Sequence, residues 1–320
     1  MAGEESRSAV LAALTANAAI AVGKLTAGAV TGSGAMFAEG GHSIADTTNQ
    51  VFLLVGIKRA QTKPDDDHPH GYGKEAFFWS FLAAIFIFVA GATFSLFQGI
   101  RTVIDPGEFH ERTFAELGLA FGVLGGAFVF EAISLVIAIR LLLRSARAQG
   151  WSVLRFLRES PDMTLKTVFW EDSAALLGLL LAAVGLAVAE IAKDETPDGV
   201  ASILIGVLLV IVAVVVGAQA RGLLLGAAAS PELRDKLRRI ALDFDEVETV
   251  LRLLTMQLGA RSVLVTGELQ IGQDLTVDQA EHLIGQIDRE IARLAPEVTS
   301  TFWELRRNPI DTSVGPRIFN

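Results

Sequence analysis

The 320-residue sequence contains no cysteine, which excludes disulfides, thiolate metal sites and cysteine nucleophiles. Histidine is scarce, with five residues, so any metal site must combine a few imidazoles with oxygen ligands. The 27 lysines and arginines are outnumbered by 36 acids and form no aromatic-rich basic patch, so nucleic acid is not expected as a partner. An HExxH motif is also missing, and neither an enzymatic activity nor a cofactor is expected.

Hydrophobic residues, in contrast, make up 51% of the chain and gather in long runs before about residue 225. A transmembrane helix needs about 20 mostly apolar residues. Runs of this length predict a six-helix transmembrane domain over residues 1–225, embedded in a lipid bilayer. The first run is longer than the core of a signal peptide and is expected to be retained. The predicted spans cover residues 10–30, 35–56, 77–104, 114–143, 168–189 and 200–217.

The basic residues between the predicted spans indicate the orientation of the chain. The connections from span two to three and from span four to five are rich in lysine and arginine, whereas the opposite connections hold little beyond Arg112 and Lys193. Because basic loops stay on the cytoplasmic side, both termini are predicted to be cytoplasmic. We therefore expect a multi-pass protein of the cell membrane.

The chain becomes polar after Ser230, which predicts a separate soluble domain over residues 226–308 and a loosely ordered tail over 309–320. The residue patterns predict the order helix, strand, strand, helix, strand, which is a small α+β domain. These elements are expected at residues 231–244, 248–256, 262–271, 276–294 and 298–305.

Span two carries a polar stripe within a hydrophobic segment. Four residues fall on one face of a helix with 3.6 residues per turn: Glu39, His42, Asp46 and Asn49. Ionisable groups are costly inside a bilayer and usually line a pathway or pair with one another, and imidazole with carboxylate suits Zn²⁺ and its neighbours. The stripe predicts a metal site centred on His42 and Asp46, with Glu39 and Asn49 as secondary candidates. The alternative is a His–Asp hydrogen bond that only holds helices together.

Span five begins with two adjacent acids, Glu171 and Asp172. Adjacent helix residues point about 100° apart, so one of the two is expected to face span two. Asp172 is the predicted ligand, with Glu171 as the alternate or as a proton carrier; the alternative is that both acids only stabilise a helix N-terminus. Lys24 lies in span one and Glu131 in span four. For Lys24, an ion pair with an acid is the alternative to a transport role. For Glu131, a structural hydrogen bond is the alternative to a proton relay.

The connection between spans two and three concentrates three acids and two histidines within residues 64–75. Asp65, His68 and His70 are secondary candidates for capturing a cation before it enters the membrane domain. An ordinary solvated turn rich in proline and glycine is the alternative.

Taken together, these motifs resemble those of the cation diffusion facilitators, which are proton-coupled exporters of Zn²⁺ and related divalent ions. The resemblance rests on residues 38–46 of span two, 68–75 of the loop and 171–175 of span five, with Asn17, Lys24 and the α+β domain. It implies a homodimer that assembles through the C-terminal domain, six helices in each subunit and a transport site shared by spans two and five. It also implies that the cytoplasmic domain has a ferredoxin-like, metallochaperone-like fold.

Several positions depart from the family pattern and bear on the metal. Val168 stands where many members have histidine one turn before the aspartate, and the sequence is similar to the branch that includes the mitochondrial zinc transporters. Tyr72 stands where some members have a second metal-binding histidine in the loop. Glu281 and Glu304 likewise stand at histidine positions of relatives, so a binuclear zinc site is not expected in the cytoplasmic domain.

The ligand set that the resemblance implies is rich in oxygen and consists of His42, Asp46, Asp172 and Glu171. The resulting prediction is a Zn²⁺/H⁺ antiporter that moves metal out of the cytoplasm by alternating access. Export of Mn²⁺, Fe²⁺ or Co²⁺ is the alternative within the family. A membrane metal sensor that does not transport is the alternative from another class.

Overall fold

A computed structural model describes residues 2–109, 111–272 and 274–306, with side chains described from Asn17 onward. The described residues form two compact units. One unit contains the chain up to residue 60 and residues 75–221, and the other contains residues 61–74 and the chain from residue 222. The domain limits 1–225, 226–308 and 309–320 stay predictions, and the tail over 309–320 lies outside the described residues.

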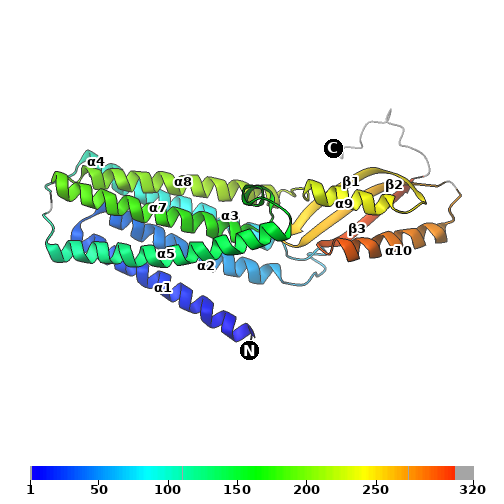
Figure 1. Cartoon of the computed structure of the whole chain (residues 1–320), viewed down its shortest axis with the longest axis horizontal. Helices are drawn as coiled ribbons and strands as arrows, with labels where there is room; N and C mark the ends of the chain where they lie inside the picture. The colour runs from blue at the N-terminus through cyan, green and yellow to red at the C-terminus, as the bar shows by residue number, and fades with distance from the viewer. Residues whose placement is uncertain (1, 110, 273, 307–320) are drawn as a thin grey trace. The chain divides into compact units, whose positions relative to one another are not determined.

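The first unit is a bundle in which long helices run side by side (Figure 1). The helix that covers span three is continuous but changes from α-helix to π-helix and back. The elements are α1 (Ala2–Thr31), α2 (Gly34–Ala60), α3 (Glu75–Phe86), the π-helical η1 (Ile87–Ala92), α4 (Thr93–Ile104), α5 (Phe114–Ala148), α6 (Val153–Glu159), α7 (Met163–Ala192) and α8 (Thr196–Leu224).

Within the described residues, four helices are long and apolar enough to cross a membrane: the continuous α3–η1–α4, α5, α7 and α8. They confirm the predicted spans three to six and make the chain a membrane protein. Helix α2 has 27 residues, but its polar stripe and the basic pair Lys58 and Arg59 reduce its apolar character. Only residues 17–31 of α1 have described side chains. That α1 and α2 also cross the membrane therefore stays a prediction.

Small residues allow the helices of the bundle to approach closely. The clearest example is Gly99 of α4, where an added Cβ would lie 2.6 Å from the backbone N of Ile203 and 2.7 Å from the carbonyl oxygen of Gly199, both in α8. Buried alanines from α1, α2, α5, α7 and α8 extend this packing through one hydrophobic core. The close packing fixes the rotation of each helix and hence the direction of the polar residues on α2 and α7.

Two elements were not predicted. Helix α6 has seven residues, which is too short to show a hydrophobic period, although Ser152 caps it by accepting a hydrogen bond from the backbone N–H of Arg155. The π-helical turn η1 inserts one residue into an apolar helix, and a uniformly apolar run carries no pattern that reveals the insertion.

The second unit contains, within the described residues, a mixed sheet of three strands in the order β1-β2-β3. Strands β1 (Val247–Gly259) and β2 (Ser262–Ile271) are antiparallel, and α10 (Val277–Leu294) connects β2 to the parallel strand β3 (Val298–Arg306). Helix α9 (Pro231–Leu242) precedes the sheet and shares its hydrophobic core with α10. The predicted order of helices and strands is confirmed, whereas the ferredoxin-like assignment stays a prediction because that fold has four strands.

Candidate metal transport site

The polar stripe of α2 faces the interior of the helical bundle. Glu39, His42, Asp46 and Asn49 are all buried, with at most 8% of any residue exposed. His42 Nε2 lies 3.5 Å from Asp46 Oδ2, one helical turn away. Among the described residues, both ring nitrogens of His42 and Oδ1 of Asp46 have no hydrogen-bond partner. These atoms are a nitrogen and oxygen donor set of the kind that a divalent ion binds.

The two acids at the start of span five lie on α7 and contact different helices. Glu171 accepts a hydrogen bond from Nδ2 of Asn49 on α2, and Asp172 Oδ2 accepts one at 2.7 Å from Ser134 Oγ on α5. The direct contact with the stripe of α2 is therefore made by Glu171. The sequence indicated that adjacent helix positions diverge, but it could not indicate which of the two faces α2.

Charge is distributed unevenly in this part of the bundle. Asp46 interacts electrostatically with Glu171, Asp172 and Glu131 of α5, and with the ammonium of Lys24. With Glu39, the described cluster holds five buried carboxylates and one buried ammonium. Carboxylates inside a membrane domain require protons or cations as compensation. The cluster is thus suited to exchange bound cations and protons.

Lys24 of α1 forms an ion pair with an acid. This is the role that the sequence analysis gave as the alternative to transport. Its Nζ is 2.9 Å from Glu39 Oε2 and 2.8 Å from Ser43 Oγ, and the side chains of Lys24 and Glu39 are completely buried. The other carboxylate oxygen of Glu39 points at Gly178 of α7, where an added Cβ would be only 2.1 Å away. Gly178 therefore leaves the space that the Glu39 carboxylate occupies.

Gly178→Ala is expected to lower the stability of the membrane domain by about 1–3 kcal/mol, because the added methyl group overlaps the pinned Glu39 carboxylate. Unfolding of the purified protein in detergent, followed by circular dichroism, measures the change. Gly126→Ala in α5 is the matched control, since no described heavy atom beyond its chain neighbours and the nearby backbone of its own helix lies within 4 Å of its added Cβ. Equal stability of the two variants would contradict the packing of Glu39 against Gly178.

The candidate ligands lie on two helices and do not surround one point. Among the described residues, no group of three or more histidine, aspartate or glutamate side chains is arranged to hold a metal ion. His42 and Asp46 contribute from α2, and Glu171 and Asp172 contribute from α7. The assignment of His42, Asp46, Asp172 and Glu171 as metal ligands therefore stays a prediction.

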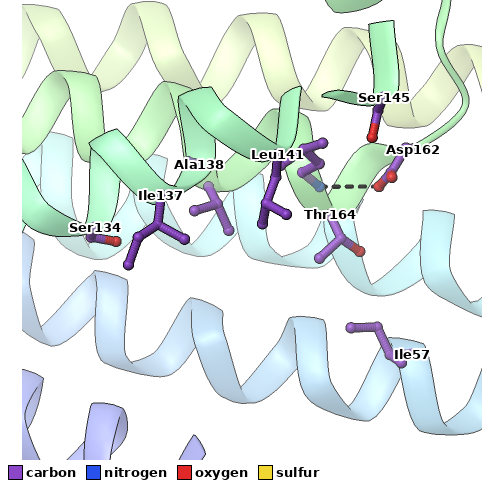
Figure 2. Close-up of a pocket in the computed structure, with 10 residues that line it drawn as sticks. Ile57, Ser134, Ile137, Ala138, Leu141, Ser145, Asp162 and Thr164 are labelled. Atoms are coloured by element: carbon purple, nitrogen blue, oxygen red, sulfur yellow. Dashed lines mark hydrogen bonds between the residues drawn. The ribbon is translucent and has the colours of Figure 1, made fainter. Parts of the chain in front are cut away.

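A cavity of about 520 Å³ lies between α2, α5 and α7 next to this cluster (Figure 2). Ile57 of α2 borders one side, while Ser134, Leu141 and Val168 are among the residues of α5 and α7 that line it. Ser134 is the lining residue whose hydroxyl donates a hydrogen bond to Asp172, so the cavity wall is one hydrogen bond away from the cluster. Ser134 was missed in the sequence because a single serine in an apolar helix forms no motif.

Near the start of α7, the cavity wall is held by a helix cap. Asp162 Oδ1 accepts a hydrogen bond at 3.1 Å from the backbone N–H of Leu165, which is the dashed line in Figure 2. This cap fixes the first turn of α7, one turn before Val168. Val168 thus lines the cavity at the position where the family resemblance leads one to expect histidine.

The loop over residues 61–74 belongs to the second unit, where its polar groups have protein partners. Asp65 accepts hydrogen bonds at 2.7 Å from both the backbone N–H of His68 and the Tyr72 hydroxyl, and these bonds lower the pKa of the Asp65 carboxyl. The ring of His70 contacts Phe302 edge to face. The loop thus folds as a hydrogen-bonded turn, and cation capture by Asp65, His68 and His70 stays a prediction.

These features define a class of protein: a helical membrane protein that buries an acidic, histidine-containing cluster beside a cavity. Comparison with known families gives the membership. Residues 10–225 match the family model described as the cation efflux transmembrane domain, and the chain belongs to this family, the cation diffusion facilitators. The resemblance that the sequence motifs indicated is confirmed.

Among curated relatives, the chain is 30% identical over 307 residues to the human "Proton-coupled zinc antiporter SLC30A9, mitochondrial". The aligned residues cover 95% of this chain and 53% of that protein. It is 28% identical to "Metal tolerance protein C4" of Arabidopsis thaliana, over 86% of this chain and 59% of the relative. It is 25% identical to "Manganese efflux system protein MneP" of Bacillus subtilis, over 92% of this chain and 93% of the relative. The chain spans about half the length of the zinc antiporter.

Proposed function

We propose that this protein exports divalent metal ions, with Zn²⁺ as its main substrate, in exchange for protons. The observation that carries the proposal is the excess of buried carboxylates around His42, beside a cavity that reaches Asp172 through Ser134. The name of the human relative supports zinc and proton coupling. Mn²⁺, Fe²⁺ and Co²⁺ are further candidate substrates, because the ligand set is rich in oxygen and MneP is named a manganese efflux protein.

In the proposed cycle, the metal enters by the cavity between α2, α5 and α7. His42, Asp46 and Asp172 bind it, and Glu171 or water completes the coordination. Because imidazole and carboxylate ligands must be deprotonated to bind metal, protons from the far side compete with the metal and release it. Alternating access of the cluster to the two sides couples metal export to proton entry.

The proposed assembly is a homodimer formed through the second unit, placed in the cell membrane with both termini in the cytoplasm. The family resemblance of the sequence supports a role of this unit in assembly. The human relative is named as mitochondrial, so an organelle membrane is the alternative location.

A flux experiment tests the proposal. Purified protein in proteoliposomes is expected to move Zn²⁺ against its own gradient when a pH gradient is imposed. Protons are expected to cross the membrane in the direction opposite to Zn²⁺, so the pH of the lumen changes while Zn²⁺ moves. Competition by Mn²⁺, Fe²⁺ and Co²⁺ ranks the substrates, and protein-free liposomes control for leakage. Binding of metal without any flux would overturn the transporter and favour a membrane metal sensor.

A further inference from the structure

A second buried ionic cluster lies at the other end of the bundle. The guanidinium of Arg112, in the connection before α5, is fully buried. Its Nε donates to the carbonyl oxygen of Thr31 at 2.6 Å, Nη1 to Glu190 Oε1 at 2.9 Å and Nη2 to Glu195 Oε2 at 2.8 Å. We call these four groups the Arg112 clasp. The clasp joins the end of α1, the end of α7 and the turn before α8.

A second set of hydrogen bonds ties the same connections together. Asp198, in the first turn of α8, is completely buried. Its Oδ1 accepts from Ser33 Oγ at 2.7 Å, and its Oδ2 accepts from the backbone N–H of Ala35 at 3.0 Å. Asp198 thus caps the N-terminus of α2 from a different helix, so the start of α2 moves with α8 as long as this cap holds.

The clasp and the cavity lie at opposite ends of α7. Val168 lines the cavity and Glu190 lies in the clasp, and this separation of 22 positions corresponds to about 33 Å of helix. Along α2, Ala35 precedes His42 by seven residues, or about 10 Å. The clasp therefore closes the end of the bundle that the cavity does not reach.

We propose that the Arg112 clasp is the gate on the side opposite the cavity, and that it opens when the cluster releases its metal. The proposal rests on the proposed transport function. A buried arginine that binds two carboxylates holds strongly while water is excluded, whereas the separated groups are stabilised by hydration once this end opens. The clasp thus has two discrete states, as a gate requires.

Because the protein has no cysteine, a single introduced cysteine reports the accessibility of one position. Ala38 is completely buried in α2, one turn from His42 on the same face and toward the clasp. Ser145 lines the cavity at the other end. Ala38→Cys and Ser145→Cys, each in protein reconstituted into nanodiscs, are labelled with a membrane-impermeant maleimide, and the two rates are compared.

Arg112→Met is expected to raise the labelling rate of Cys at position 38 by about tenfold or more, because the closed state loses its charge-assisted bonds. The rate at position 145 is expected to fall, because in alternating access the cavity side closes when the clasp side opens. Arg101→Met is the matched control, since Arg101 is an exposed arginine in the last turn of α4. In proteoliposomes, Arg112→Met is expected to lower the maximal proton-driven flux and to raise the KM for metal on the cavity side, because the state open to the cavity is less populated.

Unchanged labelling at position 38 in folded Arg112→Met would overturn the gate. Equal increases at both reporter positions would also overturn it, because they would mean that the clasp only stabilises the fold. If Arg112→Met does not fold, the milder pair Glu190→Gln and Glu195→Gln is measured in the same way and is expected to raise labelling at position 38. Labelling does not depend on flux, so a protein that transports no metal would refute the proposed function without deciding the gate.

Discussion

Asp46→Asn is expected to reduce metal flux by about 100-fold or more, since even changes to residues that only support metal ligands cost 10–100-fold. The substitution keeps the size of the side chain and one oxygen but removes its charge. In the structure, Asp46 lies 3.5 Å from His42 and within electrostatic range of Glu171 and Asp172 on α7. Initial rates of Zn²⁺ transport in proteoliposomes measure the loss.

The matched control is Asp105→Asn, an exposed aspartate directly after α4. It removes the same charge outside the bundle and is expected to keep the flux of the parent protein. Calorimetric titration of purified protein with Zn²⁺ gives a second readout, in which Asp46→Asn is expected to lose the tight binding event. An Asp46→Asn protein that transports like its parent would exclude Asp46 as a ligand and place the metal elsewhere.

Hydrophobic periodicity predicted the parts of the site that depend on one helix alone. A helix repeat of 3.6 residues was sufficient to group Glu39, His42, Asp46 and Asn49 on one face, and the cost of burying them indicated that this face is internal. The structure shows that all four are buried. The same local reasoning predicted the strands and helices of the second unit, because helical spacing and strand alternation act within a few residues.

Contacts between helices were beyond this reasoning, because they depend on how each helix is rotated and how closely it packs. The bonds from Asn49 to Glu171 and from Ser134 to Asp172 join residues 122 and 38 positions apart. Arg112 was recognised only as a basic residue in an outer loop, although its guanidinium bonds three different segments. Such partners are decided by the tertiary packing. The close approach of the Glu39 carboxylate to Gly178 is a further example.

Lys24→Met is expected to destabilise the membrane domain by about 3–5 kcal/mol, because it leaves the buried Glu39 carboxylate without its counter-charge. Methionine keeps the apolar stem of lysine almost to the position of Nζ, so the loss arises mainly from charge and hydrogen bonding to Glu39 and Ser43. Unfolding in detergent, followed by circular dichroism at constant detergent concentration, measures the change in the free energy of unfolding.

Glu39→Gln in the Lys24→Met background separates the two possible causes. If the uncompensated carboxylate causes the loss, the double variant is expected to recover most of the stability, since a neutral amide can be buried at a lower cost than an unpaired charge. The coupling free energy from the four proteins of this double-mutant cycle measures the ion pair itself. A double variant that is less stable than Lys24→Met would mean that Lys24 stabilises the bundle by packing, and Glu39 would then carry no unpaired charge in the single variant.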